Sequence, residues 1–299
     1  MNQMDARMLY LHALSPIHSG TGQATDAIDL PVAREKVFGW PYLPGSSVKG
    51  VLRDACSPPP DGNGEARKLF TAAFGPDTVN ASDGAGSLWF ADAHLLCLPV
   101  RSYHGTLAWV TCPLALERWR RDHESAGLTQ PFQIPRPEGG EAALVAPENA
   151  VAADGKLVIE ELDLAATSSD ACAALGVAIA AALFDQGDAW RDLFQKRFAI
   201  VDNDTFSFLC ETATEIRARI RLKDETKTVA DGAFWYEESV PAESVFYSPL
   251  LAMPRNGVAA TEMLGLVSSK LGGLLQIGGN ASVGQGLVRA RLGEGSVTA

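Results

Sequence analysis

The loop that follows the first predicted strand carries side chains capable of acid–base chemistry. It contains Asp26 and Asp29, with His18 before them and Arg34 after them. Because a loop can hold a carboxylate exposed to a substrate, an aspartate here is a candidate catalytic group, with His18 as a possible helper acid or base. The alternative for a single loop aspartate is turn formation or helix capping.

A second candidate is a basic strand in the C-terminal half. Arg217, Arg219, Arg221 and Lys223 alternate with apolar residues, and this period of two places all four cations on one face of a strand. Residues 224–228 then have turn character, and an aromatic triplet follows at residues 234–236. A basic hairpin beside aromatic residues is typical of single-stranded nucleic-acid binding. The alternative is a solvated strand whose arginines pair with carboxylates.

The third candidate is a helix with two cations on one face. Ser46 and Ser47 are good N-cap residues for a predicted helix that ends near residue 55. Lys49 and Arg53 are four residues apart, so we expect them to project together away from the core. Free backbone N–H groups at the helix start, flanked by these cations, are able to bind a phosphate. Two solvated surface cations are the alternative.

A glycine-rich segment near the C-terminus is the fourth candidate. Gly279 and Gly284 have the spacing of a nucleotide-binding P-loop, but Gln285 and Gly286 replace its lysine and its serine or threonine. A nucleotide hydrolase is therefore disfavoured. The loop, with Gly278 at its start, either approaches an RNA backbone closely or simply connects two strands tightly.

Composition limits the classes of function. The 299 residues include 25 basic and 36 acidic side chains, so the formal net charge is −11, and any bound polyanion requires locally clustered cations. The five cysteines include no Cys-x-x-Cys pair, and the five histidines lack metal-ligand spacing. We expect neither disulfides nor a permanent metal site. No transmembrane span or signal peptide is readable, which predicts a cytoplasmic protein with no membrane partner.

The elements that must position these groups are strands interspersed with helices, which predicts an α+β fold. Strands are predicted at residues 7–14, 87–100, 105–112, 199–201, 274–277 and 287–292. Helices are predicted from residue 113, over residues 171–184 and over residues 263–271. Residues 130–154 read as a long loop or insertion, and no clean domain boundary is visible.

Several segments, taken in order, resemble the RAMP family of CRISPR proteins. These are His18-Ser-Gly-Thr-Gly22, Ile28-Asp-Leu-Pro31, Arg34, Gly39-Trp-Pro-Tyr-Leu-Pro-Gly-Ser-Ser-Val-Lys-Gly-Val-Leu-Arg53 and Ile277-Gly-Gly-Asn-Ala-Ser-Val-Gly-Gln-Gly286. The length, residues 91–102, residues 211–217 and residues 224–227 look like the repeated backbone subunit of the type III-B (Cmr) effector complex. The resemblance covers most of the chain and is weakest over residues 130–200.

This resemblance implies a ferredoxin-like, RRM-related palm with a protruding β-hairpin thumb and helical insertions. It implies a single RAMP domain over residues 1–299, with an insertion or finger at about 130–200 and the thumb at about 212–237. Copies of the chain would stack along a guide crRNA together with other Cmr subunits, and each thumb would displace one base.

The resemblance also assigns roles to particular residues. Asp29, rather than Asp26, would cut complementary target RNA at regular intervals, with a divalent cation (Mg²⁺ or Mn²⁺) held transiently by Asp29 and His18 as a possible helper. Such a carboxylate is able to promote attack of the RNA 2′-hydroxyl on the adjacent phosphate, leaving a cyclic phosphate. The expected RNA-binding residues are Ser46, Ser47, Lys49, Arg53, Arg217, Arg219, Arg221, Gly278, Gly279 and Asn280.

Two other functions remain open. The chain is a non-cleaving scaffold that holds guide RNA in the same kind of filament, or it is a small-molecule enzyme that binds a nucleotide in the loop at residues 278–286. Replacement of Asp29 by Ala distinguishes the non-cleaving scaffold from an endoribonuclease, because only the endoribonuclease would lose RNA cleavage. Binding of a nucleotide without binding of RNA would favour the second.

Overall fold

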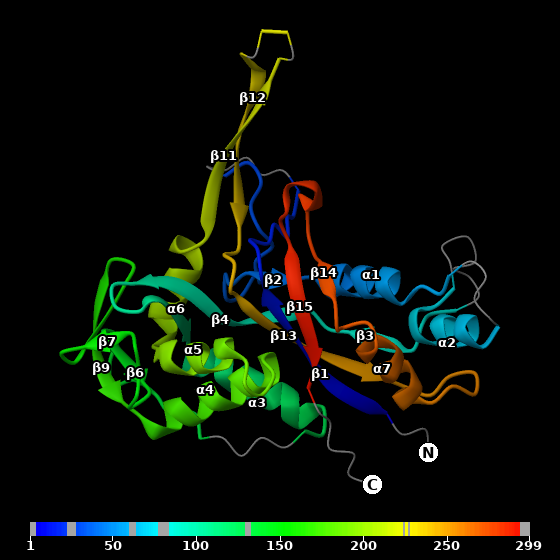
Figure 1. The fold of residues 1–299 in the computed structure, drawn as a ribbon, viewed down its shortest axis with the longest axis horizontal. Helices are drawn as coiled ribbons and strands as arrows, with labels where there is room; N and C mark the ends of the chain where they lie inside the picture. Colours follow the sequence, from blue (N-terminus) through cyan, green and yellow to red (C-terminus); the bar gives the residue numbers. More distant parts are fainter. Residues whose placement is uncertain are drawn as a thin grey trace.

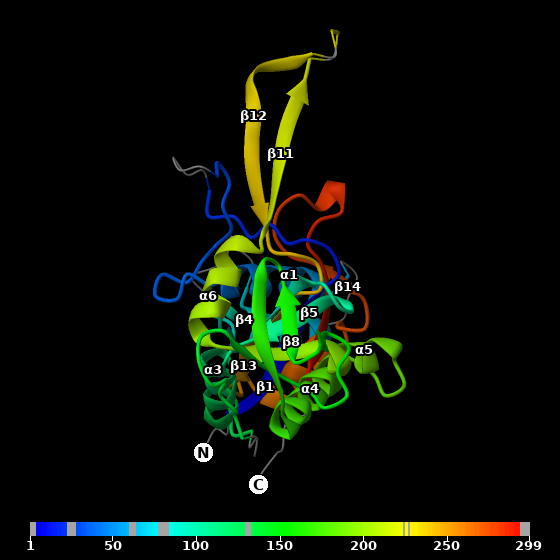
Figure 2. The ribbon, with the colours of Figure 1, turned by 90° about the vertical axis from the view of Figure 1, so that its left-hand side faces the viewer.

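The computed structural model describes residues 4–22, 28–59, 64–76, 84–128, 133–223, 225–226 and 228–293. Within these residues the chain has a mixed α+β fold, in which a 13-stranded sheet carries helices and a separate two-stranded hairpin projects away from it (Figure 1). The turned view shows the same hairpin standing clear of the sheet and helices (Figure 2). Among the helices of the described ranges, none has the length and apolar character needed to cross a bilayer.

The helices are α1 (Gly45–Cys56), α2 (Gly64–Phe74), α3 (Pro113–Ser125), α4 (Asp170–Leu183), α5 (Ala189–Arg197), α6 (Asn203–Thr212) and α7 (Ala260–Ser268). The strands are β1 (Asp5–Ala13), β2 (Tyr42–Leu43), β3 (Leu88–Phe90), β4 (Ala93–Ser102), β5 (Thr106–Thr111), β6 (Ala142–Val145), β7 (Ala152–Ala153), β8 (Lys156–Ile159), β9 (Leu162–Ser168), β10 (Phe198–Val201), β11 (Glu215–Leu222), β12 (Val229–Ser239), β13 (Val245–Ala252), β14 (Leu274–Gln276) and β15 (Leu287–Leu292).

The main sheet has the strand order β14-β15-β1-β13-β4-β5-β10-β6-β9-β8-β7, with β2 paired to β4 and β3 paired to β13. Its four strands β15, β1, β13 and β4 are each antiparallel to their neighbours. In the chain, α1 and α2 lie between β1 and β4, and α7 lies between β13 and β15. The remaining sheet, from β5 to β7, is built mainly from residues 106–168, with β10 inserted between β5 and β6.

Strand β1 is buried on both faces because it lies within the sheet and helices cover each side. Leu9 and Leu11 belong to a core that includes residues of α1, α2 and α7. Met8 and Tyr10 point the other way, into a core with residues of α3, α4 and α5. A strand buried on both faces has no need of polar alternation, which explains its nearly continuous apolar sequence.

Most predicted elements are confirmed, with three corrections. The region predicted as one strand over residues 87–100 is broken into β3 and β4. Of the two readings of residues 130–154, the loop is wrong where β6 and β7 pair with neighbouring strands, and the insertion stays a prediction. The helix predicted to begin after Ser46 and Ser47 instead has Pro44 as its N-cap, with no side-chain cap. Asp224 and Lys227 of the predicted turn lie outside the described residues.

Candidate functional site

Asp29 lies where the early loop meets the base of the hairpin. Its Oδ2 accepts a hydrogen bond from the backbone N–H of Tyr236 at 2.8 Å. The next residue extends this contact, because Leu30 donates its N–H to the Tyr236 carbonyl (3.1 Å) and accepts from the Glu238 N–H (3.0 Å). The loop therefore lies along β12 as a short strand-like segment and fixes the Asp29 carboxylate, which is half-buried, against the hairpin. Asp26 lies outside the described residues.

Glu238 anchors this loop to the rest of the molecule. Its side chain is buried and accepts hydrogen bonds from the Val32 N–H (2.9 Å), the Arg34 guanidinium (2.5 Å) and the Thr214 hydroxyl (2.8 Å). Arg34 also donates to the Cys210 carbonyl of α6 at 2.9 Å. A buried carboxylate requires such partners, and here they tie the loop, α6 and β12 together.

A second ionic cluster holds the following part of the loop. Glu35 accepts hydrogen bonds from Nη1 and Nη2 of Arg118 (3.0 and 3.1 Å) and lies 2.8 Å from His94 Nδ1. Burial alone would raise the pKa of Glu35, but the hydrogen bonds and charges of His94 and Arg118 outweigh it and lower that pKa below its usual value. The cluster thereby links the loop to β4 and α3.

His18 is held at the same base by a backbone carbonyl and by glycines. Its Nδ1 lies 2.7 Å from the Glu238 carbonyl oxygen, which only accepts, so Nδ1 carries a proton and Nε2 is the basic nitrogen of the neutral ring. A Cβ atom at Gly20 would lie 2.6 Å from Nε2, and one at Gly279 would lie 3.3 Å from Cδ2. The Gly279 N–H donates to the His18 carbonyl at 2.8 Å. Glycine at these positions therefore leaves room for the imidazole.

Glu237 joins the glycine-rich segment to the basic face of the hairpin. Its Oε1 accepts from Asn280 Nδ2 (2.7 Å) and from Arg219 Nη2 (3.2 Å). Burial acts to raise the pKa of Glu237, but the hydrogen bonds from Arg219 and Asn280, together with the charges of Arg219 and His18, lower it overall. The glutamate is therefore ionised, and it neutralises one of the cations predicted to bind RNA.

The predicted basic strand is β11, and Arg217 and Arg219 share a face as expected, whereas the strand register shifts at Arg221 and Lys223 follows the end of the strand. Arg217 and Arg219 lie opposite Glu237 and Trp235 of β12. Arg217 is exposed and forms an ion pair with Glu215 at 2.5 Å, so the carboxylate pairing considered as an alternative does occur along this strand. Arg221 is exposed farther out. The aromatic residues of β12 do not all lie beside these cations, because residues at alternate positions of a strand point to opposite faces.

Phe234 and Tyr236 point away from the arginines. The register pairs Phe234 with Ile220 and Tyr236 with Ala218, and side chains directly opposite each other lie on the same face of a hairpin. The predicted basic hairpin with aromatic residues on its second strand does form, but these two rings lie on the face opposite the arginines. Only Trp235 of the aromatic triplet shares the arginine face.

The predicted phosphate site on α1 has different surroundings. Gly45 donates its N–H to Asp92 Oδ1 at 2.7 Å, so a carboxylate already occupies the start of the helix. Ser46 is exposed, while Ser47 and Lys49 are half-buried. The expectation that Arg53 projects outward beside Lys49 is wrong, because its guanidinium donates to carbonyls at the end of α2 and just beyond it. Arg53 thus caps a neighbouring helix.

The glycine-rich segment forms a tight connection between β14 and β15 rather than a P-loop followed by a long helix. It contains only a short 3₁₀ turn, Ala281–Val283. Gly278 (φ +92°) packs so closely that a Cβ there would lie 2.5 Å from the His18 carbonyl oxygen. Asn280 adopts a left-handed conformation (φ +62°) that aims its amide at Glu237. The structure thus brings Gly278, Gly279 and Asn280 to His18 and the hairpin base.

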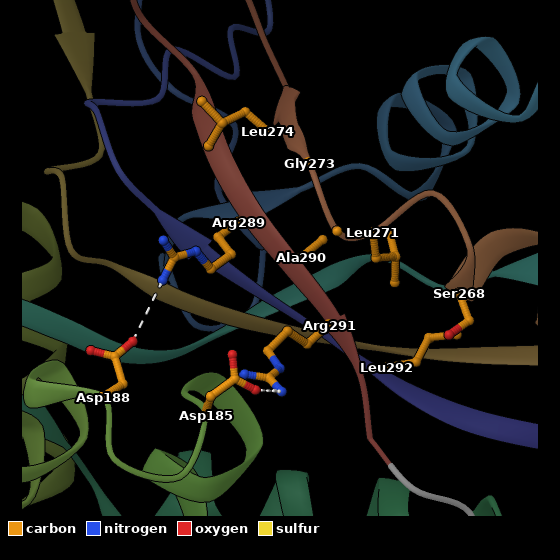
Figure 3. Close-up of a pocket in the computed structure, with 11 residues that line it drawn as sticks. Asp185, Asp188, Ser268, Leu271, Gly273, Leu274, Arg289, Ala290, Arg291 and Leu292 are labelled. Atoms are coloured by element: carbon orange, nitrogen blue, oxygen red, sulfur yellow. Dashed lines mark hydrogen bonds and ion pairs between the residues drawn. The ribbon is translucent and has the colours of Figure 1, made fainter.

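A separate pocket of about 670 Å³ lies against β15 and the α4–α5 connection (Figure 3). Its two arginines are paired with aspartates across the opening, Arg291 with Asp185 at 2.7 Å and Arg289 with Asp188 at 3.9 Å. Residues 278–286 do not line it. The pocket therefore gives no support to nucleotide binding by the glycine-rich segment.

Glu237 and Glu238 were missed by the sequence reasoning. A usable signal was present, since the two acidic residues directly follow the aromatic triplet, and adjacent residues of a strand continued through them point to opposite faces. Both are buried, and each connects β12 to a different segment of the site.

Comparisons with known proteins show which family the chain resembles. The model of the RAMP superfamily matches residues 10–289. The chain is 38% identical over 295 residues to the CRISPR system Cmr endoribonuclease Cmr4 of Pyrococcus furiosus, covering 97% of each protein. It is 23% identical over 307 residues to the CRISPR system CMR subunit Cmr4 of Saccharolobus solfataricus, covering 94% of each.

Solved structures of related proteins have the same fold as this chain. The crystal structure of oligomeric Cmr4 from Pyrococcus furiosus superposes with a TM-score of 0.74 and 31% identity, over 98% of this chain and 100% of that one. A chain of the type III-B Cmr-beta complex bound to cognate target RNA has the same fold, with a TM-score of 0.71, 18% identity and 96% coverage of both chains. The family match over most of the chain and the close curated relative together establish the assignment: the chain belongs to the RAMP superfamily.

Proposed function

We propose that the chain is the repeated backbone subunit of a type III-B CRISPR effector complex, and that it binds guide crRNA and cleaves complementary target RNA at regular intervals. The near-full-length similarity to a protein named as a Cmr endoribonuclease supports this proposal. The observation that carries it is the position of Asp29, whose carboxylate is held by the Tyr236 N–H at the base of a projecting basic hairpin. Further copies of the chain and other Cmr subunits are the proposed protein partners.

The architecture supports a ferredoxin-like palm with a thumb. The order β15-β1-β13-β4, with helices between β1 and β4 and between β13 and β15, is the order expected of a β-α-β-β-α-β unit. In this proposal the hairpin of β11 and β12 is the thumb predicted at about 212–237, with β12 continuing to Ser239, and residues 1–299 form one domain. Residues 130–200, which include β6 to β9, are the insertion.

Asp29 is the proposed catalytic residue. The hydrogen bond to Oδ2 fixes the carboxylate and leaves its Oδ1 to face a substrate. A carboxylate placed beside the 2′-hydroxyl of RNA takes up its proton as the oxygen attacks the adjacent phosphate, which leaves a cyclic phosphate and a free 5′-hydroxyl. His18 Nε2, the basic nitrogen at the same base, is a possible helper that exchanges a proton with the reacting oxygens. DNA lacks the 2′-hydroxyl, so we expect it to resist cutting.

A transient divalent ion fits this site better than a resident one. In the described part of the chain, no group of three or more His, Cys, Asp or Glu side chains could hold a metal ion. Mg²⁺ commonly binds through one or two carboxylates together with substrate phosphates, so Asp29 would be the residue that holds the ion when RNA is bound. When bound, Mg²⁺ or Mn²⁺ would neutralise charge that develops on the phosphate.

The guide RNA is proposed to follow the arginine face of the hairpin and the glycine-rich segment. Arg217 and Arg221 are exposed there, while Gly278 and Gly279 allow the backbone to be approached closely. Ser46, Ser47 and Lys49 remain predicted contacts on α1. A locally basic face of this kind reconciles RNA binding with the net charge of −11.

The test is cleavage of labelled guide-complementary RNA by the reconstituted complex with Mg²⁺, resolved on a sequencing gel. Wild type is expected to give a ladder of evenly spaced cuts, and Asp29→Ala is expected to abolish it without loss of guide binding. A target with one 2′-deoxy residue at a cut position should lose that band alone. The same ladder from both proteins, or none from either, would leave the chain as a non-cleaving scaffold.

A further inference from the structure

Glu243 lies in the short connection between β12 of the hairpin and β13 of the main sheet. The chain changes direction here, so that the hairpin projects away from the sheet (Figure 1). Glu243 has a φ of +71°, in the left-handed region that favours glycine over other residues. Strained backbone of this kind persists only where its surroundings hold it. The contacts of Glu243 therefore indicate what holds the bend.

The backbone around Glu243 has the hydrogen bonds of a β-bulge. The Glu243 N–H donates to the Ala13 carbonyl at 2.7 Å, and the Ala13 N–H donates to the Ser244 carbonyl at 2.9 Å. Two adjacent residues thus share one partner on β1, and in this type of bulge the first residue is left-handed and normally glycine. The Glu243 carbonyl accepts from Trp109 Nε1 of β5 at 2.8 Å. A bulge bends its strand, which accounts for the change of direction.

His12 of β1 holds the side chain of Glu243. His12 Nε2 lies 2.6 Å from Glu243 Oε2, and a carboxylate oxygen accepts, so Nε2 is the donor. The imidazole is buried and meets the ring of Phe184 edge to face, with centroids 5.3 Å apart. Its other nitrogen, Nδ1, has no hydrogen-bond partner among the residues that the structure describes. Because a buried polar ring is costly without partners, the contact with Glu243 explains why a histidine stands here.

We propose that His12 is a positioning residue, which holds Glu243 in the left-handed bulge and so fixes the direction of the hairpin relative to the main sheet. The inference rests on the proposed function, in which the base of this hairpin holds Asp29 against its substrate. Glu237 and Glu238 tie the hairpin to the glycine-rich segment and the early loop, whereas Glu243 ties it to β1 and β5. A change of direction would misplace the RNA-binding face, and misplacement by about 1 Å is able to slow a reaction about 100-fold.

The test measures the distance between the hairpin and the helical layer with two spin labels on full-length protein. The labels are attached to Glu225→Cys in the turn of the hairpin and to Ala174→Cys on α4, and both positions are exposed. All five native cysteines are buried, so the introduced thiols react selectively. Pulsed electron paramagnetic resonance is recorded on dilute protein without RNA, so that the result depends neither on assembly nor on cleavage.

The unsubstituted hairpin base is expected to give one narrow distance distribution. His12→Leu removes the contact with Glu243 and should broaden that distribution. Adding Glu243→Gly to His12→Leu should restore the narrow distribution, because glycine adopts the left-handed conformation without help from a side chain. A narrow distribution for His12→Leu alone would overturn the inference. A broad distribution that Glu243→Gly does not narrow would also overturn it, because it would indicate general damage to the core.

Variants at Glu243 cover the case in which His12→Leu does not fold. Glu243→Gln keeps an acceptor for His12 Nε2 and should preserve the narrow distribution, whereas Glu243→Ala keeps the backbone strain without the contact and should broaden it. Equal distributions for these two variants would overturn the role of the side chain. Asp154→Gly is the matched control, because Asp154 (φ +52°) is also left-handed but lies between β7 and β8, so the distances should not change.

The reconstituted complex tests whether the direction of the hairpin matters for cleavage. Single-turnover cutting of target RNA should slow at least about tenfold with His12→Leu and recover when Glu243→Gly is added, since the reacting groups must be closely aligned. Cutting at the full rate by His12→Leu, despite a broadened distribution, would overturn the positioning role. A wild-type complex that does not cut, with the distances as expected, would overturn the proposed function alone, because the distances still support a hairpin directed by His12.

Discussion

Strand β11 and helix α1 both carry regularly spaced cations, yet the fold gives those cations different tasks. On β11, Arg217 and Arg221 are exposed on a hairpin that projects away from the sheet and helices (Figure 2). On α1, Arg53 turns toward α2, where it donates to the carbonyls of Phe74, Gly75 and Pro76. The spacing of residues along an element predicts which side chains share a face. The elements that pack against that face determine whether those side chains contact solvent or other parts of the protein.

The base of the hairpin sharpens this contrast. There, Arg219 is paired with the buried Glu237, so even one of the β11 cations is engaged within the protein. The exposed Arg221 lies farther out along the strand. The base of the hairpin thus holds the protein together, while RNA binding is proposed for the part of the hairpin farther from the base.

The largest expected effect is at the anchor. Glu238→Ala would leave Arg34, Thr214 and the Val32 N–H without their shared acceptor, and breaking a largely buried ion pair costs about 3 kcal/mol. We expect that loss in the free energy of unfolding measured with denaturant. The exposed Glu225→Ala is the control and should change the free energy by less than about 0.5 kcal/mol. Similar losses for both variants would show that Glu238 anchors nothing.

Arg53→Met tests whether the arginine of α1 has a structural role, in contrast to the exposed arginines of β11. It removes three charged hydrogen bonds to backbone carbonyls, so we expect a loss of about 1–2 kcal/mol in the free energy of unfolding. Lys49→Met, on the same helix, should cost less than about 0.5 kcal/mol. If Arg53→Met unfolds like wild type but binds guide RNA more weakly, the phosphate contact predicted from the sequence is correct and the contrast with β11 fails.

Acid sensitivity provides a third test, through Glu237. Its pKa in the folded state is lowered, so its pairing stabilises the protein at pH values above the usual 4.5 and this contribution is lost as the pH falls below that value. Glu237→Gln has no carboxylate to protonate. Its unfolding free energy should therefore be lower near neutral pH and should fall less steeply below pH 4.5. A parallel pH profile for wild type and variant would contradict the lowered pKa.

The smallest effect concerns a single exposed cation. Arg221→Ala should leave the unfolding free energy within about 0.5 kcal/mol of wild type. It should also reduce the slope of log guide-RNA affinity against log salt by about 0.7, the value for one phosphate contact on a single strand. An unchanged slope would remove Arg221 from the RNA-binding face.

Local pattern was sufficient to predict much of the fold and part of the site. The alternation in β11 and the apolar run of α4 are short-range signals, and both elements formed where expected. Asp29, His18 and the segment from Gly278 to Asn280 were all singled out, although only long-range folding shows that Asp29 contacts β12 and that His18 contacts this segment. The proximity of His18 and Gly279, for example, joins segments at opposite ends of the chain.

The sequence predictions that were wrong concerned side chains whose surroundings depend on tertiary contacts. No local pattern shows that α2 ends beneath Arg53, or that Asp92 reaches the start of α1. The two faces of the hairpin follow from period-two alternation once the register is known, and only the register shows that Phe234 lies opposite Ile220 rather than beside an arginine. The roles of Glu237 and Glu238 likewise require knowing which segments flank β12.

The most direct test of the account is the single-turnover rate of target cleavage by complexes carrying Asp29→Asn, measured with guide-RNA affinity on the same preparations. Asparagine keeps the size of the side chain and its acceptor for the Tyr236 N–H but is not able to take up a proton. The account predicts a rate at least about 100-fold below wild type, with unchanged guide affinity and with Asp54→Asn on α1 cutting normally. Cleavage by Asp29→Asn at the wild-type rate would contradict the claim that the base of the hairpin is the cutting site.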